Sequence, residues 1–139
     1  MALERTLTII KPDAVSAGNV GNIIRIFEAN QFKIVAGRLV NLTRQEAEGF
    51  YAVHRSRPFF ASLTEFMSSG RALVMVLERE NAIARLREVM GATDPAKAAE
   101  GTIRKLYAES IERNAIHGSD APETAAYEIG YFFPKIDLV

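Results

Sequence analysis

A histidine near the carboxyl end of the chain has neighbours suited to nucleophilic chemistry. His117 ends a short apolar segment and is followed directly by Gly118, Ser119 and Asp120, and Glu128 borders an apolar helical face further on. A carboxylate at such a border needs a partner, and a hydrogen bond to one ring nitrogen would fix the histidine tautomer and leave the other nitrogen nucleophilic. Ser119 could join this network. The alternatives are a turn histidine with a satisfied side chain and a solvated glutamate.

A few basic residues stand where they could bind an anion. Lys11 follows the apolar residues Ile9 and Ile10, and open sheets often present ligand groups at the carboxyl end of a strand. Arg87 is near the end of a predicted helix, and Arg104 lies in a glycine-punctuated loop that also holds Thr93. Guanidinium groups match phosphate oxygens in a bidentate way, although each such residue taken alone is more often a solvated surface charge.

Aromatic residues precede the middle of the chain. Tyr51 and His54 are three positions apart on one predicted helix and therefore share a face. Phe59 and Phe60 follow Pro58; one is expected in the core and the other could stack on a base, and the pattern does not select between them. The sequence has no Walker A, Gly-x-Gly-x-x-Gly or Gly-x-Ser-x-Gly motif, so a nucleotide site would not use these standard phosphate loops.

Short predicted strands that alternate with helices must position these side chains. Strands are expected at residues 6–10, 32–40, 72–77 and 114–117, and helices at 20–27, from 43, at 58–66, at 81–90 and from about 120 to 133. Gly37 is expected to mark a bulge, and Ser119 or Asp120 to cap the last helix. The weakly patterned segment 90–117 is interpreted as a long loop, either functional or disordered, with short helical pieces around residues 103–107. This order predicts an α+β sandwich with helices on one face of an antiparallel or mixed sheet. A β-α-β-β-α-β core is the simplest match.

Length and composition limit the class of protein. The 139 residues contain 48% hydrophobic residues and no linker, which predicts a single domain spanning 1–139. The 17 basic and 17 acidic residues balance, which argues against a nucleic-acid or membrane binder and requires any anion site to be a local cluster. The absence of cysteine and the presence of only two histidines disfavour a structural zinc site. Without a targeting or membrane segment, the protein is expected in the cytoplasm.

Several ordered motifs resemble one enzyme family. The segment 114–120, Asn-Ala-Ile-His-Gly-Ser-Asp, is similar to the active-site signature of the nucleoside diphosphate kinases. The same family has motifs similar to those at residues 9–13, 49–54, 57–60, 90–93 and 99–104. The match is collinear from about residue 4 to residue 133, and it resembles a bacterial member.

The resemblance implies a fold, a reaction and site residues. The implied fold is a ferredoxin-like sandwich with a long loop before the catalytic strand. The implied reaction moves the γ-phosphoryl group from a nucleoside triphosphate, commonly ATP, to a nucleoside diphosphate by a ping-pong route with broad base tolerance. His117 would be phosphorylated on Nδ1, Glu128 would hold its other nitrogen and Ser119 would assist. The implied phosphate ligands are Lys11, Arg87, Thr93, Arg104 and His54. The other implied contacts are Lys11 and Asn114 to the ribose, Phe59 and Ile111 to the base, and Tyr51 beside the histidine.

The resemblance also implies a cofactor and an assembly. Mg²⁺ would be carried mainly by the nucleotide phosphates, without a certain direct protein ligand, and Asp120 could reach it through water. The expected partners are nucleotides and further copies of the chain, as dimers that build a tetramer or a hexamer. Two rival functions are a histidine phosphatase or phosphohistidine carrier, and a nucleotide- or nucleic-acid-binding module without catalysis. The neutral charge and the lack of an aromatic strand motif argue against the binding module.

Overall fold

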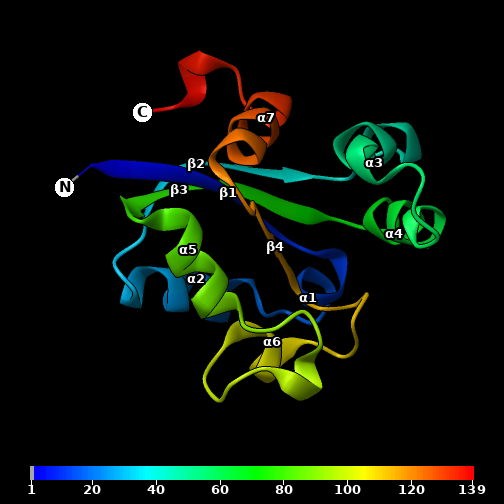
Figure 1. Ribbon diagram of the computed structural model, residues 1–139, viewed down its shortest axis with the longest axis horizontal. Coiled ribbons are helices and arrows are strands. Elements are labelled where there is room, and N and C mark those ends of the chain that lie inside the picture. The colour runs from blue at the N-terminus through cyan, green and yellow to red at the C-terminus, as the bar shows by residue number, and fades with distance from the viewer. Residues whose placement is uncertain (1) are drawn as a thin grey trace.

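A four-stranded antiparallel sheet with the order β2-β3-β1-β4 forms the centre of the molecule (Figure 1). The computed structural model describes residues 2–139. The strands are β1 (Leu3–Ile10), β2 (Lys33–Val40), β3 (Ala72–Glu80) and β4 (Ile116–Gly118). β2 and β4 are the two edge strands, and β4, which carries His117, is the shortest.

The described part of the chain also contains seven α-helices and three 3₁₀ turns, of which α7 and η3 follow the last strand. The helices are α1 (Pro12–Ser16), α2 (Val20–Ala29), α3 (Arg44–Phe50), α4 (Phe60–Met67), α5 (Ala82–Met90), α6 (Ile103–Tyr107) and α7 (Pro122–Phe132). The 3₁₀ turns are η1 (Ala52–His54), η2 (Pro95–Lys97) and η3 (Lys135–Asp137). Across residues 2–139, no helix is both long and apolar enough to cross a membrane.

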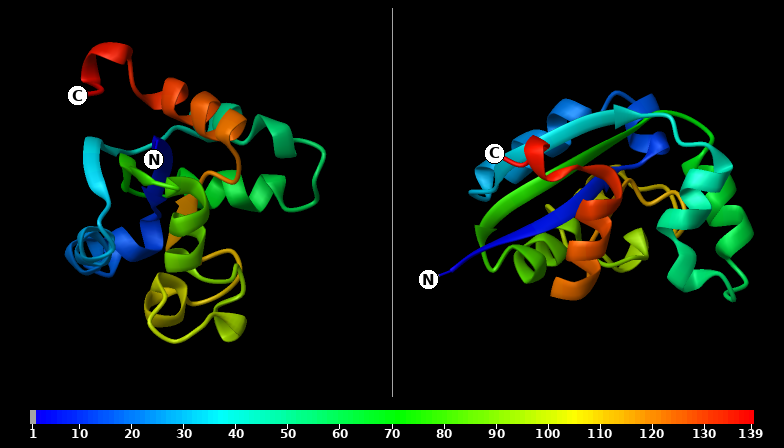
Figure 2. Two further views of the ribbon diagram at one scale, coloured as in Figure 1. Left: turned by 60° about the vertical axis from the view of Figure 1, so that its left-hand side comes forward. Right: turned by 90° about the horizontal axis from the view of Figure 1, so that it is seen from above.

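The helices cover the two faces of the sheet and give each face its own core. α7 lies on one face of the sheet, and α3 and α4 lie at one end of the sheet (Figures 1 and 2). α2 and α5 lie on the other face. The alternation of β3 supplies both cores, since Val74 and Val76 belong to one and Met75 and Leu77 to the other. The sheet is therefore buried on both sides, and a site at the end of β4 has access to residues from both layers.

Local signals in the sequence explain where two of the helices begin. Thr43 forms a capping box with Glu46, in which each side chain accepts a backbone N–H of the other residue, and this starts α3. α7 has Pro122 in its first turn, where a missing N–H costs nothing. Its N-cap is Ala121, so the expected capping by Ser119 or Asp120 is wrong. The hydroxyl of Thr124 accepts the N–H of Ala121 instead.

The structure confirms the predicted α+β sandwich and its β-α-β-β-α-β order, with an antiparallel sheet, and it corrects several details. Helices cover both faces of the sheet rather than the one face expected, because β3 carries apolar residues on both faces. The irregularity in β2 falls between Ile34 and Ala36, so the bulge expected at Gly37 is misplaced. β3 continues to Glu80 because its final residues pair with the start of β1. The helix expected to start at Pro58 begins at Phe60.

Two further corrections concern residues near the site. Pro12 opens the short helix α1, which is not among the helices expected from the sequence. Tyr51 ends α3 and His54 lies in η1, so the two do not share one helix, although their ring centroids are 6.5 Å apart. The segment 114–115, expected in the last strand, forms a turn before β4.

Candidate active site

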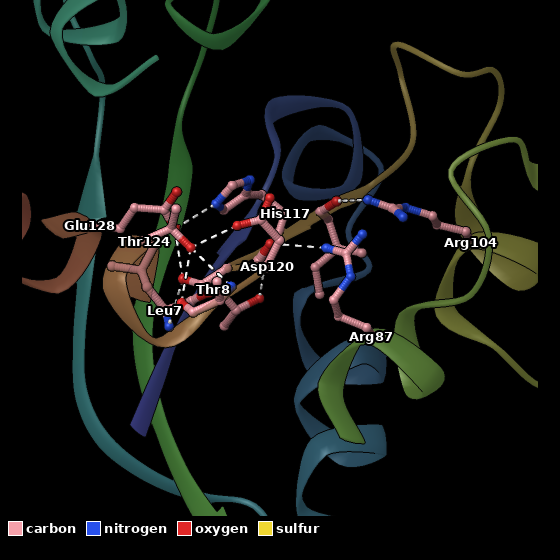
Figure 3. A network of polar contacts seen from close by, with 12 residues as sticks. Leu7, Thr8, Arg87, Arg104, His117, Asp120, Thr124 and Glu128 are labelled. Carbon is pink, nitrogen blue, oxygen red and sulfur yellow. Dashed lines mark hydrogen bonds and ion pairs between the residues drawn. The ribbon is translucent and has the colours of Figure 1, made fainter. Parts of the chain in front are cut away.

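A hydrogen bond between a histidine and a glutamate lies at the centre of the site (Figure 3). β4 pairs with β1 so that His117 stands opposite Ile9, and its ring lies on the α7 side of the sheet. Nε2 of His117 is 2.9 Å from Oε1 of Glu128, and the hydroxyl of Ser119 donates to the same oxygen at 2.6 Å. The expected contact is therefore present. It assigns the proton of a neutral ring to Nε2, and no described residue bonds Nδ1.

Aromatic rings surround the histidine. The ring of Phe50 meets that of His117 edge to face at a centroid distance of 5.3 Å, and Tyr51 does so at 6.0 Å. These contacts and the bond to Glu128 leave the imidazole little freedom to turn. The hydroxyl of Tyr51 is buried without a partner among residues 2–139. Burial, with a smaller effect from Glu128, raises the pKa of Tyr51 above its usual value, so the hydroxyl stays protonated and can donate.

A cavity of about 290 Å³ opens in front of the histidine. Its lining residues are Phe50, Tyr51, Val53, His54, Arg87, Thr93, Arg104, His117, Gly118, Asp120, Thr124 and Glu128. Most of the site residues expected from the sequence are therefore brought together here. Arg87 and Arg104 approach from the opposite layer to Glu128 (Figure 3).

Arg87 and Arg104 bring two positive charges to the cavity, whose lining also holds the carboxylates of Asp120 and Glu128. Arg104 is buried, and burial followed by the repulsion of Arg87 lowers its pKa to about 10, so it remains charged at neutral pH. Its guanidinium donates to the carbonyl oxygens of Gly91 at 3.1 Å and Ile116 at 2.8 Å, while Nε lacks a partner among the described residues. An anion bound between the two guanidinium groups would relieve their repulsion.

Side chains also hold the backbone of β4. The carbonyl oxygen of Ile116 accepts from Arg104, that of His117 accepts from the hydroxyl of Thr8 at 2.8 Å, and that of Gly118 accepts from Arg87 at 3.4 Å. All three carbonyl groups of the strand thus accept a side-chain hydrogen bond. β4 is short, but its position is fixed by both neighbouring strand and neighbouring helices.

Lys11 and Asn114 form a buried pair next to the cavity rather than in its lining. The ammonium group of Lys11 donates to Oδ1 of Asn114 at 2.8 Å, and both side chains are buried. Burial, and then the repulsion of Arg104, lowers the pKa of Lys11 to about 8. The lysine is therefore largely charged at neutral pH but close to losing its proton.

The residues expected to contact a base lie outside the cavity. Phe59 is 42% exposed and Ile111 is 60% exposed, whereas Phe60 packs against the core, which decides between the two phenylalanines. The ring of Phe59 lies 5.6 Å from that of His54. Ser62 donates to Glu112 at 2.6 Å and so joins the segments that carry Phe59 and Ile111.

Asp120 is an exposed carboxylate at the rim of the cavity. The hydroxyl of Thr124 donates to it at 2.7 Å, and this bond is the main reason why the pKa of Asp120 lies below its usual value. Within residues 2–139, no group of three His, Asp or Glu side chains is arranged to hold a metal ion. A charged oxygen of this kind is the type of ligand that a hard cation prefers.

Sequence reasoning missed some residues of the cavity, including Thr124, Val53 and Phe50. Thr124 had a signal, because it lies one helical turn before Glu128 and therefore shares its face. Val53 and Phe50 had none beyond their proximity to Tyr51. A nucleophilic nitrogen oriented by a carboxylate, in a cavity with two guanidinium groups, is typical of an enzyme that handles phosphoryl groups.

Comparison with known proteins identifies the family. The family model "Nucleoside diphosphate kinase" matches residues 4–138. Nucleoside diphosphate kinases of Nitrosospira multiformis and Nitrosomonas europaea are each 62% identical over 138 residues, which cover 99% of this chain and 98% of theirs. The solved structure of the Aquifex aeolicus nucleoside diphosphate kinase superposes with a TM-score of 0.97 at 46% identity and covers 99% of this chain and 100% of that one. That of Halobacterium salinarum, a complex with CDP, gives 0.94 at 38% identity, over 99% and 92% of the two chains.

The chain belongs to the nucleoside diphosphate kinase family. Its activity is that of a phosphotransferase that acts on nucleoside triphosphates and nucleoside diphosphates. The fold expected from the resemblance, a ferredoxin-like α+β sandwich, is confirmed by the same comparisons.

Proposed function

We propose that the γ-phosphoryl group is transferred in two steps through His117. In the first step, Nδ1 attacks the γ-phosphorus of a nucleoside triphosphate; a bond from nitrogen to phosphorus forms, the bond to the bridging β,γ-oxygen breaks, and the nucleoside diphosphate leaves with that electron pair. A second nucleoside diphosphate then attacks the phosphohistidine in the reverse sense. The observation that carries this proposal is the bond of 2.9 Å from His117 Nε2 to Glu128, inside the cavity that Arg87 and Arg104 line.

Glu128 has two roles in this proposal. Its carboxylate keeps the proton on Nε2, so that the lone pair of Nδ1 is available. It also opposes the positive charge that the ring acquires when Nδ1 bonds to phosphorus. Ser119 fixes the carboxylate by its own hydrogen bond of 2.6 Å. The opposition to the ring's positive charge grows toward the transition state, as rate enhancement requires.

The phosphates are proposed to bind Arg87, Arg104, Thr93 and Lys11, with His54 and the hydroxyl of Tyr51 nearby. The free Nε of Arg104 is a buried donor that an oxygen could satisfy. Phosphoryl transfer depends mainly on positioning and on charge stabilisation, which fixed guanidinium groups supply. Lys11 and Asn114 are proposed to bind the ribose as well, because their mutual bond presents an ammonium and an amide together.

The base is proposed to stack on Phe59 with Ile111 on its other side. Neither side chain can read a base edge, so base tolerance should be broad. The relative from Halobacterium salinarum that was solved with CDP supports binding of a pyrimidine nucleotide in this family.

Further parts of the proposal concern the cofactor, the assembly and the setting. Mg²⁺ would reach the site with the nucleotide, where Asp120 could hold it through water and where it would neutralise phosphate charge. The chain is proposed to act as one domain spanning 1–139, to dimerise and to build a tetramer or a hexamer; the edge strand β2, with Ile34 and Leu39 exposed, is an unpaired surface within residues 2–139 that supports this. The cytoplasm, where its nucleotide substrates are made and used, is the proposed location.

The test follows the phosphoryl group. Incubation with γ-labelled ATP should label the protein, and addition of a nucleoside diphosphate should move the label to the nucleotide. The label should be stable in base and labile in acid, as a phosphoramidate is. His117→Ala should abolish labelling and retain nucleotide binding; labelling of this variant at the parental level would overturn the assignment. Release of free phosphate at the rate of transfer would instead favour a phosphatase.

A further inference from the structure

A strained turn lies two residues before the catalytic histidine. Ala115 has a φ of 72°, in the left-handed region that side chains with a Cβ rarely adopt. The N–H of Ile116 bonds to the carbonyl oxygen of Asn114 at 2.9 Å, so the chain closes a three-residue turn around Ala115 before β4 begins. Such a conformation persists only where surrounding contacts impose it.

Two contacts impose it, and both come from one segment. The N–H of Ala115 donates to Oδ2 of Asp13 at 3.1 Å, and its carbonyl oxygen accepts from the backbone N–H of Lys11 at 2.9 Å. Both polar groups of the strained residue are thus bound by the end of β1 and the first turn of α1. Asp13 is 7% exposed and does not line the cavity of the site. Burial raises the pKa of its carboxyl group above the usual value, while the N–H of Ala115 acts in the opposite direction.

The turn determines where two proposed ligands stand. Asn114 is its first residue, and its side chain accepts from the ammonium of Lys11 at 2.8 Å. The segment that provides Lys11 therefore also holds the turn that presents Asn114. Asp13 is the side chain of this segment that bonds to the turn. If the turn relaxed toward an unstrained conformation, Asn114 would move away from Lys11, and the entry of the chain into β4 would change.

We infer that Asp13 is a positioning residue for nucleotide binding, which acts by locking the strained turn at Ala115 and so aligning Asn114 with Lys11. It touches neither substrate nor the reacting atoms. The inference deepens the proposed function, because it rests on the roles proposed above for Lys11 and Asn114. It differs from a purely structural role in what it predicts: the folded variant should bind the ribose badly, rather than merely being less abundant.

The primary test compares Asp13→Ala with the unmodified protein. The acceptors are ADP and its 3′-deoxy analogue. We expect Asp13→Ala to raise KM for ADP about tenfold and to lower the preference for ADP over the analogue by a similar factor, since small misplacements of binding groups have effects of this size. The KM value and the preference do not depend on the fraction of folded protein. Thr43→Ala, which loses a backbone N–H acceptor at the distant start of α3, is the matched control and should change stability alone.

Two further variants test the route through the turn. Asp13→Asn keeps an oxygen acceptor for the N–H of Ala115 and should restore most of the preference for the 3′-hydroxyl. Ala115→Gly removes the penalty on positive φ, so Asp13→Ala should have a much smaller effect in that background, which also keeps the test usable if Asp13→Ala alone does not fold.

The inference is overturned if folded Asp13→Ala retains both the KM and the preference within about twofold, or if its effect is the same with and without Ala115→Gly. Failure of the proposed function would look different, because the unmodified protein would then form no phosphoenzyme on His117.

Discussion

The bond between His117 and Glu128 makes the reactivity of one nitrogen depend on the proton held at the other. Glu128→Gln can still bond to Nε2, but its amide does not oppose the positive charge on the ring, and it can donate as well as accept. We expect phosphorylation by ATP to slow by about 10- to 100-fold, the range seen when an orienting carboxylate is lost. Ser119→Ala should have a smaller effect because it removes only the support of the carboxylate.

Rapid quench measurements of the first half-reaction would check this ranking. Nucleotide affinity serves as the internal control, since neither side chain is proposed to touch the nucleotide. An unchanged rate in Glu128→Gln would show that the glutamate does not assist the histidine.

Lys11 gives the site a pH dependence on its alkaline side. Its pKa of about 8 means that the free protein loses the ammonium above that pH, whereas a bound phosphate favours the charged form. We therefore expect KM for nucleotides to rise above pH 8 and proton uptake on binding between about pH 8 and 10. Because the folded pKa lies below the ordinary value, this lysine disfavours folding below pH 8, and stability should rise as pH increases through that window.

Calorimetric titration in buffers of different ionisation enthalpy would measure the proton uptake. Lys11→Arg is the informative comparison, because a guanidinium stays charged throughout and should remove the uptake. Equal uptake in the two proteins would assign it to another group.

Exposed apolar contacts to the base imply weak selectivity. Stacking contributes about 1–3 kcal/mol for any base, while Phe59 and Ile111 offer no donor or acceptor. We expect kcat/KM for ADP, GDP, CDP and UDP to differ by no more than about tenfold, or ~1.4 kcal/mol, and Phe59→Ala to weaken all four in parallel. A thousandfold preference for one base would indicate a residue that reads its edge.

At the level of the elements, a missing side chain fixes the distance between α5 and β4. A Cβ on Gly118 would lie 2.5 Å from Sδ of Met90, closer than real Cβ atoms approach, and in a tight contact of 3.0 Å with a methyl carbon of Leu86. Gly118→Ala should therefore push α5 away from the sheet and move Arg87, which bonds to this glycine. We expect a loss of about 1–3 kcal/mol of stability, together with weaker binding of the triphosphate.

Gly130→Ala is the matched control for this substitution. Gly130 lies in α7 with nothing within 4 Å of its potential Cβ. It should therefore gain about 0.5–1 kcal/mol of stability with unchanged kinetics. Thermal unfolding and KM for ATP would separate the two effects, and a stable, fully active Gly118→Ala would contradict the packing argument.

The elements differ in how far the sequence predicts them. The strands and long helices follow from periodicity, and the contact of His117 with Glu128 follows from a carboxylate at the edge of a buried face. α1 and the turn at Ala115 do not, because they depend on each other: the short helix places Asp13, and Asp13 binds the turn. Such tertiary bonds between segments far apart in the chain leave no periodic pattern. The bulge was predicted at Gly37 instead of residues 34–36 for a related reason. The position of the bulge depends on how β2 pairs with β3, and not on the glycine.

At the scale of the whole molecule, the edge strand β2 connects the fold to the proposed assembly. Its outer side has no partner within residues 2–139, and Leu39 is 58% exposed on it. If copies of the chain pair there, Leu39→Glu should shift the protein to smaller species because it places a charge in an apolar contact. Ile136→Glu, at an equally apolar but more exposed position outside the sheet, is the control.

Sedimentation velocity would measure both variants, and circular dichroism would establish that they remain folded. An unchanged assembly of a folded Leu39→Glu protein would place the interface elsewhere.

The side-chain hydrogen bonds to the carbonyl oxygens of β4 make the mobility of this strand depend on whether a nucleotide is bound. Arg87 and Arg104 hold the ends of the strand that carries His117, and the same two guanidinium groups are proposed to bind the phosphates. A nucleotide that immobilises these arginines therefore also immobilises the strand, although it touches little of the strand's backbone. Without it, the carbonyl oxygen of Gly118 at the end of this edge strand depends on Arg87, whose side chain is exposed and bonds at 3.4 Å. Amide protons of β4 should consequently exchange faster in the empty protein than those elsewhere in the sheet. The bound nucleotide should slow this exchange, because it makes rigid the strand with which it reacts.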